Sequence, residues 1–321
     1  MAPEPLSAQS KLASRDTSDE SDVNGVPLPP DGILFMNKTA KGGVQQGTSQ
    51  VRLLMESGVN VRTGTLLDVG CGWGRLAYGL LSTGFDGRYI GVDIVRERTD
   101  WLEANFTSVH PRYSFHFLDI KNDLYNPNGR LTRISYDALI SDAAPTTIVL
   151  LSVFTHMYEA DIAHYLIDLA TIMSSDSTLV FSCLLFDGVA QERIRQGVAS
   201  RKFPYKLSAD CRYDLKSEPL GAIAYTEPKI LQLLGRAGLA GRVIRGNWSR
   251  AKADRKGSWG QDVIIAKKAE HGATGPVDPA DERKAKDRRG PGFHDRMAAW
   301  RRWITSSMTP PIPFPRRKAV H

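Results

Sequence analysis

Residues 65–75 read TLLDVGCGWGR, and this stretch decides the fold. Thr65–Val69 is a short run typical of a buried strand, three glycines follow at alternate positions, and Arg75 opens a segment with helical periodicity. A glycine-rich turn between a strand and a helix marks the carboxyl edge of a parallel sheet, where nucleotide-like ligands bind. The free N–H groups at the start of the helix favour an anionic ligand group.

The chain from about residue 31 to residue 270 alternates strands with helices. Beyond the first strand we predict strands at 88–93, 113–119, 147–153, 178–185 and 262–267, and helices at 75–81, 162–173 and 226–237. This alternation predicts an α/β fold with a mostly parallel sheet covered on both faces. We therefore expect a single domain over residues 31–270.

The flanking segments differ from this domain in composition. Residues 1–30 are polar and lack the apolar stretch of a signal peptide, so we expect them to be disordered. No apolar run approaches the roughly 20 residues of a membrane span. The cysteines Cys71, Cys183 and Cys211 are an odd, widely spaced trio without metal-ligand spacing, and we expect no metal site. These features favour the cytoplasm.

Residues 271–321 form a basic tail. Asp281–His321 holds 11 Lys and Arg against 4 Asp and Glu, so the whole excess of +7 lies there and the preceding 280 residues carry 31 charges of each sign. Residues 293–308 show an apolar stripe at helical spacing, formed by Phe293, Met297, Trp300, Ile304 and Met308. A basic amphipathic helix of this kind lies peripherally on an inner membrane face, contacts a partner protein, or packs on its own domain. The neutral body argues against nucleic acid as a partner.

The spacing of the glycines indicates which ligand binds. Side chains at Gly70, Gly72 and Gly74 would fill the space of a ligand lying against the backbone, and glycine also provides positive φ angles. A dinucleotide-binding loop requires glycine or alanine where Arg75 stands. The spacing G-x-G-x-G therefore favours S-adenosylmethionine over NAD or FAD.

Two carboxylates at strand ends support the same ligand. Asp93 ends the second strand, 23 residues after Gly70, where a carboxylate accepts hydrogen bonds from both ribose hydroxyls. Asp119 ends the third strand, where we expect it to bind the adenine amino group while Ile120 flanks the ring.

From about Gly42 to Lys268 the chain resembles bacterial class I S-adenosylmethionine-dependent methyltransferases of the methyltransferase-11/25 type. The matching stretches are LLDVGCGWGRLA, YIGVDI followed by DWLEA, FLDIKNDLYNPNG, SVFTHM and GQDVIIAKK. The first two are shared by the whole class, whereas YNPNG, SVFTHM and GQDV mark a narrower subgroup. The chain departs from that subgroup at Thr146, where an aspartate is usual, and at residues 175–177, where Ser-Asp-Ser replaces Pro-Gly-Gly.

The resemblance implies a Rossmann-like sheet of seven strands with an antiparallel last strand. It also carries over a set of cofactor contacts, which are Asp68, Gly70, Gly72, Gly74, Asp93, Asp119 and Ile120. Cys71 lies within the same turn, and we interpret it as a small loop residue of the cofactor site without a nucleophilic role.

Transfer of a methyl group to a hydroxyl requires a base. His156 follows the fourth strand and is the leading candidate, and Asp142 is the second. The alternative for His156 is a structural hydrogen bond at a helix start capped by Thr155. We expect the acceptor to be a hydroxyl on a small molecule or glycan. The segment Phe186–Tyr225 is a candidate acceptor lid, with Arg201, Lys202, Tyr205, Arg212, Tyr213 and Lys216, or else a solvated loop.

Two other functions remain open. Residues 136–145, YDALISDAAP, resemble a motif of ribose 2′-O RNA methyltransferases, but the lysine expected near the fifth strand is missing from residues 178–187. A motif for methylating base amino groups does not match at residues 152–155 either. A non-catalytic scaffold that binds the cofactor and docks a partner through its tail fits the same motifs, and only an activity assay separates it from an enzyme.

Overall fold

The computed structural model describes residues 22–34, 37–133, 136, 139–140, 144–249 and 259–269. Three sequence predictions concern residues outside these ranges: the disorder of residues 1–21, the base candidate Asp142, and the basic tail with its amphipathic segment 293–308.

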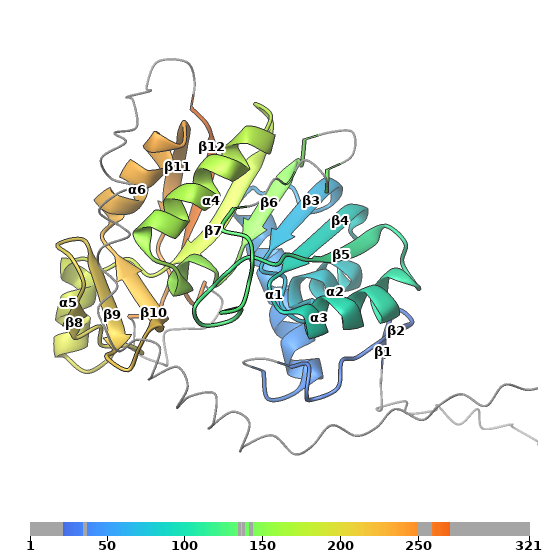
Figure 1. Cartoon of the computed structure of the whole chain (residues 1–321), viewed down its shortest axis with the longest axis horizontal. Coiled ribbons are helices and arrows are strands. Elements are labelled where there is room, and N and C mark those ends of the chain that lie inside the picture. Colours follow the sequence, from blue (N-terminus) through green and yellow to red (C-terminus); the bar gives the residue numbers. More distant parts are fainter. Residues whose placement is uncertain are drawn as a thin grey trace, which may run out of the picture.

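A seven-stranded sheet forms the centre of the domain (Figure 1). Its strands, in spatial order, are β11 (Leu239–Ile244), β12 (Asp262–Lys268), β7 (Thr178–Cys183), β6 (Thr147–Leu150), β3 (Thr63–Val69), β4 (Asp86–Asp93) and β5 (Tyr113–Phe117). All neighbouring strands are parallel except that β12 runs antiparallel to both β7 and β11. The predicted sheet, with its antiparallel last strand, is confirmed.

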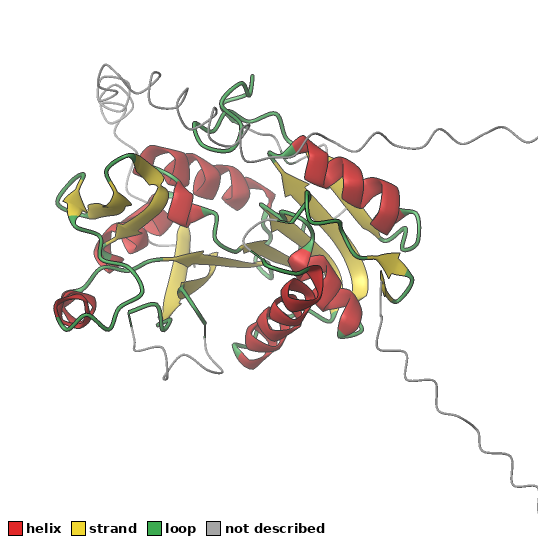
Figure 2. Cartoon of the chain, turned by 90° about the horizontal axis from the view of Figure 1, so that it is seen from below, coloured by secondary structure: helices red, strands yellow, loops and turns green. Residues whose placement is uncertain are grey.

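Helices cover both faces of the sheet, as Figure 2 shows. Successive residues of β3 point to opposite faces, so Leu66 packs with one set of helices and Leu67 with the other. The Leu66 face is covered by α1 (Ala40–Glu56), α2 (Arg75–Ser82) and α3 (Arg96–Leu102), which continues into a π-helical turn at Glu103–Thr107. The Leu67 face is covered by α4 (Glu159–Ile172) and α6 (Glu227–Arg236). The carboxyl edge of the sheet remains available for a site.

The segment predicted as a lid folds as a small unit of its own. It contains α5 (Gly188–Arg195) and a three-stranded antiparallel sheet of β8 (Tyr205–Lys206), β9 (Cys211–Leu215) and β10 (Glu218–Tyr225). A separate apolar cluster packs Phe203 of this unit against Trp248, which follows β11 (Leu239–Ile244). The segment is therefore folded rather than a loop, although Lys202, Tyr205 and Lys216 are exposed to solvent.

Several element boundaries differ from the prediction, and two of the differences have a clear structural cause. The expected disorder up to residue 30 is wrong from Asp22 onwards, because β1 (Asp22–Val23) and β2 (Val26–Pro27) form a hairpin. Val26 in this hairpin is fully buried, and the Tyr78 hydroxyl donates to the Pro27 carbonyl at 2.5 Å. β6 ends at Leu150 rather than at residue 153, because Ser152 adopts a left-handed backbone with φ of 61°. Among the described helices, none is both long and apolar enough to cross a membrane.

Candidate functional site

The glycine turn between β3 and α2 has the backbone conformation predicted for it. Gly70, Gly72 and Gly74 have φ angles of 78°, 58° and 87°, which residues with a Cβ rarely adopt. Backbone N–H groups of Gly70 and Cys71 both donate to the Val92 carbonyl, at 2.8 and 3.0 Å. These bonds fix the turn against the end of β4.

The three glycines are needed for different reasons. A Cβ on Gly72 would meet no atom within 4 Å, so this position opens onto empty space. A Cβ on Gly70 would lie 2.5 Å from Val153 Cγ2, and one on Gly74 would lie 2.7 Å from Leu102 Cδ2. The expectation that all three glycines make room for a ligand is therefore corrected. Gly72 opens onto empty space, whereas Gly70 and Gly74 lack a Cβ that would meet Val153 and Leu102.

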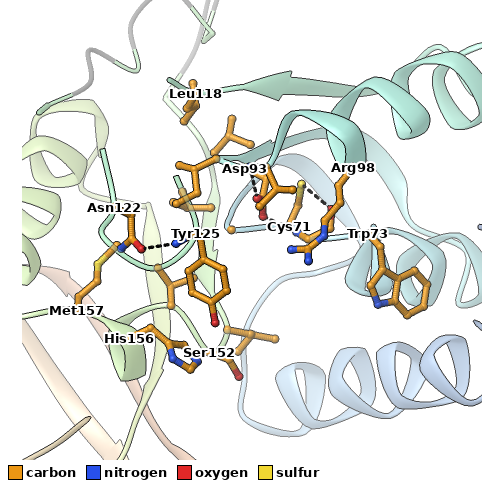
Figure 3. A pocket seen from close by; sticks show the side chains of 18 of the residues that line it. Cys71, Trp73, Asp93, Arg98, Leu118, Asn122, Tyr125, Ser152, His156 and Met157 are labelled. Carbon is orange, nitrogen blue, oxygen red and sulfur yellow. Dashed lines mark hydrogen bonds between the residues drawn. The ribbon is translucent and has the colours of Figure 1, made fainter. Parts of the chain in front are cut away.

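An open cleft lies at the carboxyl edge of the sheet, where β3, β4 and β6 end. It holds about 960 Å³ of empty space, a volume that includes open solvent at its mouth. Figure 3 shows Trp73 and Arg98 towards one side of this cleft and Tyr125 and His156 towards the other. Among the predicted site residues, the cleft brings together Gly70, Cys71, Gly72, Asp93 and His156.

Asp93 presents its carboxylate to the cleft while holding the glycine turn. Its Oδ2 accepts from the Gly72 N–H at 2.8 Å, and its Oδ1 accepts from the Val95 N–H at 2.9 Å. Burial raises the pKa of Asp93, whereas the nearby Arg98 guanidinium and the backbone donors lower it. Each carboxylate oxygen has two lone pairs, so one on each oxygen remains for a ligand hydroxyl.

The structure places Asp119 and Ile120 outside the cleft lining. The Asp119 carboxylate accepts from Arg130 Nε at 2.5 Å, and this ion pair lowers its pKa. Ile120 is buried and bridges to Leu131. The cleft is instead lined here by Leu118, because β5 ends at Phe117 and the residues that follow it face different ways.

Two residues of the following loop line the cleft and were not predicted. The Asn122 side chain accepts from the Leu124 and Tyr125 N–H groups, at 3.0 and 2.9 Å, and this turn directs Tyr125 into the cleft (Figure 3). The loop is closed at its base by paired backbone bonds between Asn122 and Asn126, both of 3.0 Å. The narrow YNPNG motif in the sequence indicated that this loop is distinctive, but it does not reveal which of its side chains faces the cleft.

Asp68 lies behind the glycine turn rather than in the cleft lining. It is 3% exposed and accepts from the Tyr89 hydroxyl at 2.6 Å. Burial is the main cause that raises the pKa of Asp68 to about 7, and the charge of Asp93 adds to it. Burial also raises the pKa of the Cys71 thiol, so the thiol stays protonated. A protonated thiol is a poor nucleophile.

Two arginines that sequence analysis did not assign to ligand binding also line the cleft. Arg75 lies in the first turn of α2, and its Nη1 donates to Gln46 Oε1 of α1 at 3.2 Å. Arg98 of α3 lies near Asp93. Together with the N-terminus of α2, these guanidinium groups make this wall of the cleft electropositive.

His156 reaches the opposite wall from a short 3₁₀ helix, Phe154–His156. Its Nδ1 lies 2.8 Å from the Leu220 carbonyl oxygen, and its ring stands perpendicular to the Tyr125 ring with centroids 5.7 Å apart. Burial lowers the pKa of His156, so the imidazole is neutral at pH 7. The proposed cap at Thr155 is wrong, because α4 begins after Tyr158 and is preceded by no side-chain cap.

The small sheet contributes to the site through its backbone. The Leu220 carbonyl that holds His156 belongs to β10. The six polar and aromatic residues predicted for an acceptor lid are absent from the described cleft lining. Arg201 pairs with Asp214 at 3.0 Å, and the Arg212 guanidinium lies over the Phe186 ring at 4.6 Å. These side chains stabilise the small unit internally.

No family model matches the chain. The structure is similar to a solved Burkholderia thailandensis 1,6-didemethyltoxoflavin-N1-methyltransferase with bound S-adenosylhomocysteine (17% identity, 71% of this chain and 79% of that chain, TM-score 0.43). It is also similar to magnesium protoporphyrin IX methyltransferase from Synechocystis PCC 6803 (17%, 74% and 90%, TM-score 0.43) and to a glycopeptide N-methyltransferase (12%, 69% and 94%, TM-score 0.45). At such identities, and with TM-scores below 0.5, these similarities establish neither activity nor substrate for this chain.

Proposed function

We propose that the chain is a class I S-adenosylmethionine-dependent methyltransferase that methylates a hydroxyl group of a small molecule or glycan. The observation that carries this proposal is the pairing of two walls across one cleft. One wall holds the Gly72 opening and the free lone pairs of Asp93, and the other holds a neutral histidine.

The first wall fits a nucleoside with a carboxylate-bearing arm. Gly72 allows close approach to the backbone, and Asp93 retains one acceptor site per oxygen for two ribose hydroxyls. The electropositive side near Arg75 suits the carboxylate of an amino acid moiety. When bound, S-adenosylmethionine supplies a methyl group on a sulfonium for in-line transfer.

The second wall supports proton removal from the acceptor. The Leu220 carbonyl only accepts hydrogen bonds, so Nδ1 of the neutral His156 ring carries the proton and Nε2 keeps its lone pair. Because its pKa is lowered from the ordinary value near 6.5, His156 stays neutral at pH values where a free imidazole is already becoming protonated. In this role Nε2 takes the hydroxyl proton as the acceptor oxygen attacks, which contributes about 10²–10⁴-fold to the rate.

The chemistry of the second wall also favours an uncharged acceptor. The charged residues that line the cleft, among those described, are Arg75, Asp93 and Arg98, and all belong to the first wall. The part of the lining that follows β6 is uncharged, and it comprises Leu151, Ser152, Val153, His156 and Met157. A charged acceptor group would be desolvated here without a charged partner in the described lining, which is costly.

Titration calorimetry tests the cofactor half of the proposal. We expect the purified protein to bind S-adenosylmethionine and S-adenosylhomocysteine but not NADH. Binding of NADH alone would contradict the proposal.

Metabolite profiling of a deletion strain can identify the acceptor, as a metabolite that lacks a methyl group in that strain. With that acceptor and methyl-labelled S-adenosylmethionine, we expect His156→Gln to lose about 10²–10⁴-fold in turnover while keeping its affinity for S-adenosylhomocysteine. If profiling yields no acceptor and the pure protein binds the cofactor without turnover on fractionated cell extract, the non-catalytic scaffold is favoured instead.

A further inference from the structure

Ser152 holds an unusual backbone conformation at the edge of the cleft. Its φ is 61°, in the left-handed region that disfavours residues with a Cβ. The described residues include two other non-glycine positions of this kind: Asn24, in the β1–β2 turn, and Phe203, in the small unit. Ser152 is the one of the three that lines the cleft, and backbone strain of this kind concentrates at functional sites.

A network of three hydrogen bonds, two of them made by Ser152 itself, ties this residue to Ser182 and Gln261. The Ser152 N–H donates to Ser182 Oγ of β7 at 2.7 Å. The hydroxyls of Ser182 and Ser152 then both donate to Gln261 Oε1, at 2.6 and 3.2 Å. Gln261 directly precedes β12, which pairs with β7 and places Val263 opposite Ser182. The network therefore spans from β12 across β7 to the end of β6.

The left-handed turn determines where the following residues lie. Immediately after it, Val153 packs into the space that Gly70 leaves by lacking a Cβ. The chain then enters the 3₁₀ helix, in which the His156 N–H donates to the Val153 carbonyl at 3.0 Å. The position of the His156 ring at the cleft wall thus depends on the direction in which the chain leaves Ser152.

We propose that Gln261 and Ser182 are positioning residues that hold Ser152 in its left-handed conformation and thereby fix His156 at the cleft wall. The importance of that position for transfer rests on the proposed function, whereas the positioning itself does not. Neither Gln261 nor Ser182 belongs to the described cleft lining, so both act through Ser152.

A glycine at position 152 separates positioning from general stability. Gln261→Leu removes the acceptor shared by both hydroxyls, and we expect the left-handed turn to relax. Adding Ser152→Gly should restore the turn, because glycine adopts positive φ without strain and keeps the N–H that donates to Ser182. Gln232→Leu is the matched control, since Gln232 is exposed on α6.

The readout is the tautomer of His156, measured by nitrogen-15 NMR of the histidine rings in the full-length protein. The His156 signal is assigned by its loss in His156→Gln. We expect a single Nδ1–H tautomer in the wild type and in Gln232→Leu, loss of that single form in Gln261→Leu, and its recovery in the S152G/Q261L double variant. If Gln261→Leu does not fold, the double variant carries the test through the same recovery.

Two results would overturn the proposal. One is an unchanged His156 tautomer in folded Gln261→Leu, and the other is a double variant that is unfolded or shows mixed tautomers. Titration with S-adenosylhomocysteine is performed on the same samples. A wild type that does not bind this probe contradicts the proposed function but leaves the positioning test intact, because the histidine spectrum requires no ligand.

Discussion

Replacing Asp93 by alanine gives the sharpest test of how the cleft binds its nucleoside. In the ligand-free protein each carboxylate oxygen accepts one backbone N–H, from Gly72 or from Val95. Two acceptor sites remain, and we assign them to the two ribose hydroxyls. Asp93→Ala removes both ligand bonds, each of which involves a charged acceptor and contributes about 1.5–3 kcal/mol.

The expected loss of binding free energy is therefore about 3–6 kcal/mol, which corresponds to an affinity for S-adenosylhomocysteine lower by about 10²–10⁴-fold. Asp93→Asn should bind S-adenosylhomocysteine nearly as weakly as Asp93→Ala does. An amide has one carbonyl oxygen, so its NH₂ group must face the N–H of either Gly72 or Val95 and cannot accept from it. This pattern distinguishes a bidentate carboxylate from a single contact.

Titration calorimetry of the purified variants measures these affinities, and thermal melting reports how much of each sample is folded. Asp100→Ala is the matched control, because Asp100 is exposed on α3. It should bind as the wild type does. The ribose assignment is refuted if Asp93→Ala melts as a folded protein and binds S-adenosylhomocysteine within about threefold of the wild type, since a threefold change is less than 1 kcal/mol.

Three further predictions concern other parts of the site. Gly72→Ala should weaken S-adenosylhomocysteine binding in calorimetry and lower the melting temperature less than Gly74→Ala does. Gly74→Ala, whose new Cβ would meet Leu102, should lower the free energy of unfolding by about 1–3 kcal/mol in urea titrations. The pKa of Asp68 is raised to about 7, so the folded state holds this proton more tightly than the unfolded state and loses stability as the pH rises from 3.8 through 7. Asp68→Asn should lack this loss, and its free energy of unfolding at pH 8 should exceed that of the wild type by at most about 4 kcal/mol. A pH profile of stability that is the same in the variant and the wild type would contradict this. The pKa of His156 is lowered, so unfolding takes up a proton as the pH falls below about 6.5, and stability decreases there; in denaturant titrations from pH 7 to pH 5, His156→Gln should show a smaller decrease than the wild type.

Local sequence patterns were sufficient to predict the parts of the site that lie close together in the chain. The glycine turn and Asp93 are each defined by a strand end and a few neighbouring residues, and both lie at the cleft as predicted. The central parallel strands were predicted because they are buried on both faces and therefore apolar. In contrast, β11 was missed, because this edge strand reads LAGRVI and its exposed residues break any periodic pattern.

Sequence patterns do not specify the side-chain contacts, local or distant, that decide where a side chain points. Asp119 has the residue type and position of an adenine ligand, but Arg130 in the following loop pairs with its carboxylate. The inward direction of Tyr125 depends on a turn made by Asn122, and sequence spacing does not specify it. The bond between Ser152 and Gln261 joins residues 109 positions apart, which no local pattern predicts.

Two of the three narrow motifs of the sequence line one wall of the cleft, and the third supports that wall from behind. The YNPNG loop places Tyr125 edge-on against His156, SVFTHM contains the left-handed Ser152 and the histidine itself, and GQDV provides Gln261. The motifs shared by the whole class form the opposite wall, where Gly72 and Asp93 lie. Under the proposed function, the wall built by the shared motifs binds the cofactor, and the wall built by the narrow motifs receives the acceptor and its proton. Substitutions in the narrow motifs should therefore change which acceptor is used, and how fast, before they change affinity for the cofactor.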